Sequence, residues 1–101
     1  MNYFGHATVA CWRTTLPTFV LGAMLPDFER MSGTRLPAVG DDEVQRGVRW
    51  HHLTDAVFHD CATFGALCQA ARTTLREAGL ARGPCMAIAH IGIELLLDGL
   101  L

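Results

Sequence analysis

Apolar residues recur every three or four positions along almost the whole chain, and this is the period of an α-helix. The pattern predicts a short amphipathic helix over residues 2–12. A second helix begins at residues 14–17, where hydroxyl residues and an early proline are typical of a helix start, and it ends before Pro26. Asp27 would then lie just past the end of that helix. Residues 29–40 contain two glycines and one proline without any period, so we expect a loop there.

Two longer stretches with the same period make up the rest of the chain. Acidic residues 41–43 stand at the start of the first, where they complement a helix dipole, and a break near residues 60–63 would divide this stretch into two helices. Gly-Pro at residues 83–84 marks the start of a last, strongly apolar helix over residues 86–101. No segment alternates with a period of two. The sequence therefore predicts an all-α fold, a bundle of four to five helices in a single domain over residues 1–101.

Composition narrows the classes of function. Of the 101 residues, 50% are hydrophobic and 18% are charged, which excludes a disordered chain. The formal charge of −2 has the wrong sign for a domain that binds the phosphate backbone, so we expect no nucleic acid partner. No apolar run reaches the ~20 residues of a membrane span, and no export signal is visible. We expect a cytoplasmic protein, and the apolar last helix favours a homo-oligomer.

The cysteines form no Cys-x-x-Cys pair. Cys61 and Cys68 are seven residues apart, so one helix face could bury both. We expect all four to be reduced thiols in the core, as is usual in a cytoplasmic protein: Cys11, Cys61, Cys68 and Cys85.

Histidines and carboxylates occur at helical spacing in two places. His51 and Asp55 are four residues apart, so they lie one turn apart on one helix face and can reach a single cation, and His59 extends this row by another turn. His90, Glu94 and Asp98 repeat the spacing within a helix that is otherwise almost entirely apolar. Charged groups there are costly unless they are paired, protonated or bound to a metal.

Together with His6 and Asp27, these groups form a mixed imidazole and carboxylate set. Such sets bind Mn²⁺, Fe²⁺, Zn²⁺ or Mg²⁺ and can lower the pKa of a bound water. The alternative for each group is a structural one, a solvated helix face or a histidine–carboxylate hydrogen bond. On this alternative the chain is a helical core without a metal.

Four segments carry a resemblance to a known family. They are MNYFGHA at residues 1–7, GAMLPDF at residues 22–28, GVRWHHLTD at residues 47–55 and ELLLDGLL at residues 94–101. In order and approximate spacing they resemble the acyl carrier protein phosphodiesterase family, over the whole chain. The resemblance implies an all-helical fold with an HD-like site, as in metal-dependent phosphohydrolases. It implies hydrolytic removal of 4′-phosphopantetheine from holo-acyl carrier protein with a divalent cation, usually Mn²⁺.

The resemblance also implies roles for particular residues. It marks six metal ligands, with Glu94 at a position where the family has an aspartate: His6, Asp27, His51, Asp55, Glu94 and Asp98. His52 or His59 would be the catalytic group that transfers a proton, because imidazole titrates near neutral pH. Arg46 and Arg49 would hold a phosphate or an acidic partner protein, or else belong to a solvated helix face.

The chain departs from the family pattern at several positions. His59 stands where an acidic residue is usual, Ala62 where a proline is common, and Gly99 where a histidine often follows the aspartate. Family members continue beyond the point that corresponds to Leu101, so the chain resembles their N-terminal part. These departures favour one alternative, a degenerate, non-catalytic helical interaction protein. A second alternative is another bacterial metal-dependent hydrolase, similar to zinc-dependent phospholipase C, because Gly-x-x-Leu-Pro-Asp at residues 22–27 after a helix histidine also resembles segments of those proteins.

Overall fold

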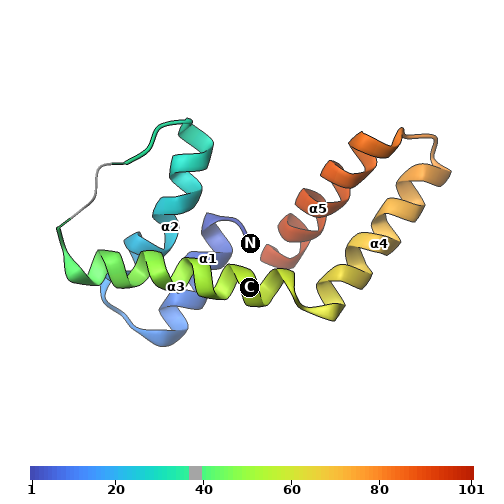
Figure 1. Ribbon diagram of the computed structural model, residues 1–101. Helices are drawn as coiled ribbons and strands as arrows, with labels where there is room; N and C mark the ends of the chain where they lie inside the picture. Colours follow the sequence, from blue (N-terminus) through green and yellow to red (C-terminus); the bar gives the residue numbers. More distant parts are fainter. Residues whose placement is uncertain (37–39) are drawn as a thin grey trace. The chain divides into compact units, whose positions relative to one another are not determined.

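The computed structural model describes residues 1–36 and 40–101, and every regular element in these ranges is an α-helix (Figure 1). The all-α prediction, with four to five helices, is confirmed. The five helices of the described residues are α1 (Tyr3–Arg13), α2 (Pro17–Ser32), α3 (Asp42–His59), α4 (Ala62–Glu77) and α5 (Arg82–Asp98).

The chain forms two compact units. The first, Met1–Ala56, contains α1, α2 and most of α3, and the second, Val57–Leu101, contains the end of α3 with α4 and α5. None of the helices in the described ranges combines the length and the apolar character that a membrane crossing requires.

The starts of α1 and α3 follow from local side-chain caps. The Asn2 side chain accepts a hydrogen bond from the backbone N–H of Phe4 at 2.9 Å, so α1 begins where the sequence predicts. The Asp41 side chain accepts hydrogen bonds from the backbone N–H groups of Glu43 at 2.8 Å and Val44 at 3.1 Å. These carboxylate contacts satisfy N–H groups that have no partner within the helix, and they explain the acidic start of α3.

In the first unit, α2 and α3 approach each other through two glycines. A Cβ atom on Gly22 would lie 2.1 Å from the carbonyl oxygen of Val44, and one on Gly47 would lie 2.1 Å from that of Phe19. Any larger residue at either position would force the backbones apart. Next to this crossing, Ala10, Phe19 and Ala23 form the buried core of the unit.

Helix α2 runs through Pro26 instead of ending before it. The prediction of a helix end there is wrong, and so is the position of Asp27 past that end. A proline inside a helix removes one backbone hydrogen bond, but its fixed φ angle remains helical. The turns beyond it also make tertiary contacts, since the rings of Tyr3 and Phe28 lie 5.6 Å apart.

Helix α2 ends at Gly33, whose φ of 66° is the left-handed conformation that commonly terminates a helix. Residues 29–32, predicted as the start of a loop, therefore belong to the helix. Residues 33–36 and 40 do lie outside the helices. The rest of the predicted loop, residues 37–39, lies outside the described residues.

In the second unit, α4 and α5 pack against each other around buried Phe64, Cys68, Cys85 and Ala89. A break at Asp60 and Cys61 separates α3 from α4, in the place where the sequence allows one. The last helix begins close to the predicted Gly-Pro and ends three residues before the end of the predicted range, at Asp98.

The cysteines differ in burial. Cys68 and Cys85 are buried, but Cys11 and Cys61 are exposed, so the prediction of four core thiols is wrong for these two. Cys61 is the residue that precedes α4, and it therefore does not share a helix face with Cys68. All four are free thiols in the described structure.

Candidate metal centre

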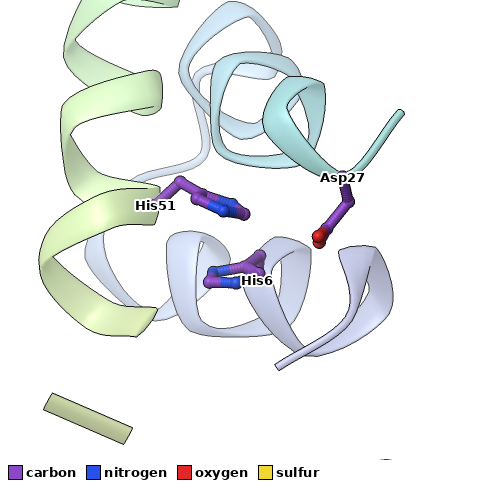
Figure 2. A group of neighbouring side chains, drawn as sticks. All are labelled: His6, Asp27 and His51. Carbon is purple, nitrogen blue, oxygen red and sulfur yellow. The ribbon is translucent and has the colours of Figure 1, made fainter. Parts of the chain in front are cut away.

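Three ligand groups from three different helices meet inside the first unit. His6 of α1, Asp27 of α2 and His51 of α3 point toward one another (Figure 2). One ligand atom from each lies within 4.8 Å of the others. The residues are only 1%, 5% and 2% exposed, respectively. We call these three residues the first cluster.

The local sequence explains how each helix brings its ligand to this point. His6 lies in the first turns of α1, directly after the Asn2 cap. Asp27 reaches the cluster because α2 continues through Pro26. His51 lies one turn beyond Gly47, at which α3 contacts the backbone of α2.

A hydrogen bond to the main chain defines the tautomer of His51. Its Nδ1 lies 2.8 Å from the carbonyl oxygen of Ala23, and because a carbonyl only accepts, Nδ1 must be the donor. Nε2 of the neutral ring then carries a lone pair. This is the arrangement typical of a metal-binding histidine, whose other ring nitrogen donates to a backbone carbonyl or carboxylate.

His6 stacks on His51, with ring centroids 3.7 Å apart. Its Nδ1 is 3.4 Å from the hydroxyl oxygen of Thr54, and this hydroxyl donates to the Trp50 carbonyl at 2.8 Å. Since the hydroxyl proton is used there, the oxygen can accept from Nδ1 of His6. In that tautomer Nε2 of His6 also carries a lone pair.

Two buried polar atoms of the first cluster lack a hydrogen bond within residues 1–36 and 40–101: Nε2 of His6 and Oδ2 of Asp27. The other oxygen of Asp27 lies 3.5 Å from the guanidinium of exposed Arg30. A buried polar atom without a partner costs about 1–3 kcal/mol. A cation between the two imidazoles and the carboxylate would satisfy both atoms at once.

Asp55 lies beside the first cluster, one turn beyond His51 as the spacing predicts. Its Oδ1 is 3.3 Å from Nε2 of His6 and 2.9 Å from the N-terminal amine of Met1. In the tautomer with the proton on Nε2, His6 donates toward this carboxylate; in the metal-binding tautomer the lone pair of Nε2 faces it. A cation placed next to both atoms would be coordinated by both, so Asp55 is a further candidate ligand.

Burial determines the protonation of the first cluster. It lowers the pKa of His6 from 6.5 to about 4, helped by the charges of His51 and the N-terminal amine and opposed by Asp55. Burial also lowers the pKa of His51, while it raises the pKa of the Asp27 carboxyl. Both imidazoles are thus neutral at neutral pH, which is the form that binds a metal.

Glu94 and Asp98 belong to the second unit, where Glu94 contacts His59 and His90. His52 is exposed on α3 and meets His51 edge-on, with centroids 5.2 Å apart. The structure thus brings together four of the six predicted metal ligands within the first unit, His6, Asp27, His51 and Asp55.

Sequence reasoning missed the groups that orient the histidines. The carbonyl of Ala23 cannot be identified from residue type, because every residue has a carbonyl. Thr54 could have been found, because it lies between His51 and Asp55 on the same helix.

A second feature of the first unit is a hollow of about 200 Å³ lined by Arg13, Phe19, Arg46, Arg49, Trp50 and Leu53. The guanidinium of Arg13 lies 4.8 Å from the centre of the Trp50 ring, which is a cation–π distance. Arg46 pairs with Glu43 at 2.7 Å. Three arginines at one hollow give it an excess of positive charge.

Comparison of the chain with protein-family models, with curated proteins and with solved structures finds no match.

Proposed function

We propose that this protein is a metal-dependent phosphohydrolase whose divalent cation is held by His6, Asp27 and His51, with Asp55 beside them. The observation that carries the proposal is the convergence of three buried ligand groups, two of whose polar atoms have no hydrogen-bond partner in the described part of the chain. Two imidazoles and one or two carboxylates are a donor set for Mn²⁺, Fe²⁺ or Zn²⁺. Mn²⁺ is the first choice, because the sequence resembles a family that usually uses it.

The chemistry of such a site divides between the cation and the chain. When bound, a divalent cation supplies Lewis acidity toward a phosphoryl oxygen and toward water. The chain holds the ligands in place, through the Ala23 carbonyl for His51 and the Thr54 hydroxyl for His6. Of the two histidines that the sequence suggests for proton transfer, we assign the role to His52, which is exposed next to His51.

The substrate class follows from the sequence motifs and from charge. The resemblance to acyl carrier protein phosphodiesterases suggests a phosphodiester, the 4′-phosphopantetheine linkage of holo-acyl carrier protein. The hollow lined by Arg13, Arg46 and Arg49 supports an anionic substrate or partner, since guanidinium groups bind phosphate and carboxylate with paired hydrogen bonds. We propose this hollow as the place where the substrate's negative charge is bound.

The proposal is tested by an assay of the purified chain with Mn²⁺. Release of 4′-phosphopantetheine from holo-acyl carrier protein is followed by mass spectrometry, and hydrolysis of bis(p-nitrophenyl) phosphate is measured in parallel. Asp27→Asn should abolish both activities, while Arg72→Ala, a substitution in the second unit, should change neither.

The two substrates separate the alternatives. Mn²⁺-dependent cleavage of the small diester without release of 4′-phosphopantetheine would replace the acyl carrier protein substrate with another phosphodiester. Metal binding without hydrolysis of either substrate would overturn the enzymatic proposal and favour a non-catalytic interaction protein.

A further inference from the structure

A second group of side chains that could bind a metal lies in the second unit. It consists of His59, at the end of α3, with His90 and Glu94, one turn apart on α5. We call these three residues the second cluster. It shares no residue with the first cluster and lies wholly within residues 57–101.

The three ligand atoms of the second cluster form a nearly equilateral triangle. Nε2 of His59 is 3.2 Å from Nε2 of His90, and the two nitrogens are 3.3 Å and 3.1 Å, respectively, from Oε1 of Glu94. Two ligands about 2.0–2.1 Å from a tetrahedral Zn²⁺ are about 3.3 Å apart. The triangle therefore has the dimensions of one face of a zinc coordination tetrahedron.

Hydrogen bonds alone do not account for all three contacts. If both Nε2 atoms carry a proton, each can donate to Glu94, but the two N–H groups then face each other at 3.2 Å. If only one carries a proton, the other nitrogen and the carboxylate oxygen are two acceptors in contact. A cation that all three atoms coordinate removes the conflict in either case.

Aromatic packing holds the two imidazoles in this orientation. Their rings are nearly parallel, with centroids 5.1 Å apart and an interplanar angle of 8°. The buried ring of Phe64 meets both edge-on, at 5.4 Å from His59 and 5.3 Å from His90. Ligands that are held in place before the metal arrives lose little entropy when they bind it.

The position of the cluster suits a site with an open coordination position. The side chains of His59, His90 and Glu94 are 33%, 47% and 13% exposed, respectively, so solvent or an external ligand can approach. Two histidines and one carboxylate are the protein ligands of a common class of open zinc site.

We propose that His59, His90 and Glu94 form a second divalent-cation site in the second unit, with the ligand set and dimensions of a zinc site. The proposal is independent of the function proposed above, and it assigns Glu94 to this site.

The test counts metal ions in the full chain. The protein is stripped with a chelator and loaded with Zn²⁺; bound zinc is measured by mass spectrometry, and affinity by calorimetry. We expect two ions for the wild type, one for Glu94→Gln and one for His90→Ala. The loss of one of three ligands should weaken the second site by roughly a hundredfold or more. Glu77→Gln, an exposed glutamate at the end of α4, is the matched control and should retain both ions.

Additional variants separate this proposal from the proposed function. His6→Ala should also retain one ion, and His6→Ala combined with Glu94→Gln should retain none. A wild type that binds a single ion, which is lost in Glu94→Gln but retained in His6→Ala, would overturn the phosphohydrolase proposal alone. A Glu94→Gln or His90→Ala protein with the wild-type zinc content, and with native helicity by circular dichroism, would overturn the second site.

Discussion

His51 donates a hydrogen bond from Nδ1 to the carbonyl oxygen of Ala23, 2.8 Å away. The bond joins α3 to α2 and leaves Nε2 of His51 with the lone pair that a cation needs. Because the acceptor belongs to the main chain, no side-chain substitution at residue 23 deletes it. The bond depends instead on how closely the two helices approach, and this is determined by Gly22 and Gly47.

Substitution of Gly47 should therefore affect both stability and metal binding. In Gly47→Ala the new Cβ would lie 2.1 Å from the Phe19 carbonyl oxygen, so α3 must move away from α2. Overpacking of this kind costs about 1–3 kcal/mol. We expect urea denaturation to show at least that loss, and calorimetry to show weaker Mn²⁺ binding because His51 moves away from Ala23.

The matched control is Gly65→Ala, an exposed position inside α4 at which a Cβ meets no atom of the described residues within 4 Å. Alanine is a better helix former than glycine by about 0.8–1.0 kcal/mol, so this variant should be stabilised. Equal effects of the two substitutions on stability would contradict the close approach of α2 and α3.

Asp27→Asn should separate the stability of the fold from its response to metal. Burial raises the pKa of the Asp27 carboxyl, so the charged form is unfavourable in the metal-free protein. Asparagine has the same shape without the charge. We expect the metal-free variant to melt at or above the wild-type temperature. Asp27→Asn should also lose the stabilisation by Mn²⁺. For the wild type this stabilisation is about 2.7 kcal/mol when the free Mn²⁺ concentration is a hundred times the dissociation constant.

Thermal unfolding with and without Mn²⁺ measures both quantities. Asp42→Asn, at an exposed position in the first turn of α3, is the control and should keep the full response to the cation. A shift of the melting temperature by Mn²⁺ that survives in Asp27→Asn would exclude this carboxylate as a ligand.

The first cluster shows which parts of a site the sequence can predict. The spacing of His51 and Asp55 on one helix is local information, and the structure places both in the predicted part of α3. The predicted position of Asp27 past a helix end is wrong, because α2 continues through Pro26 and makes contacts beyond it that outweigh the local preference of proline to end a helix. The crossing at Gly22 and Gly47 is tertiary, and no periodicity of either segment indicates it.

The second cluster shows the same limit. The spacing of His90 and Glu94 places them on one face of α5, and this can be read from the sequence. Their association with His59 requires a helix break at Asp60, followed by the return of the chain through α4 and α5. Residue spacing along a helix cannot indicate which side chain of another element will meet it.

The pKa of His6 predicts that the protein loses stability as the pH falls. In the unfolded chain His6 takes up a proton near pH 6.5, but in the folded chain it does so only near pH 4. Between these values the unfolded state binds more protons than the folded state. The contribution of His6 to the free energy of unfolding is therefore complete above pH 6.5 and is lost as the pH falls toward 4. At about 1.4 kcal/mol for each pH unit, the loss is on the order of 3 kcal/mol. The lowered pKa of His51 acts in the same direction.

Asp27 acts in the opposite direction, because its raised pKa makes the folded state the better proton acceptor above pH 3.8. It therefore offsets part of the loss. Urea denaturation at a series of pH values, in the presence of a chelator, measures the sum. His6→Gln removes the titrating imidazole and should give a flatter profile. A wild-type stability that is constant from pH 7 to pH 4.5 would contradict the neutral, buried state of His6.

The chemical reactivity of the four thiols provides a last prediction. Cys61 is exposed directly before α4, and the backbone N–H groups of Phe64 and Thr63 hold the pKa of its thiol below the usual range. Burial raises the pKa of the Cys68 thiol instead. Because the thiolate is the reactive form, iodoacetamide at neutral pH should modify Cys61 first.

Cys11 is the matched comparison, since it is also exposed but lies within the last turns of α1, and does not directly precede a helix. Peptide mass spectrometry after timed quenching gives the rate at each cysteine. We expect Cys61 to react several-fold faster than Cys11, and buried Cys68 and Cys85 to react only under denaturing conditions. The preference for Cys61 should disappear when urea unfolds α4, because the N–H groups that stabilise the thiolate are then no longer aligned. A rate at Cys11 equal to that at Cys61 in the native protein would show that the start of α4 does not activate this thiol.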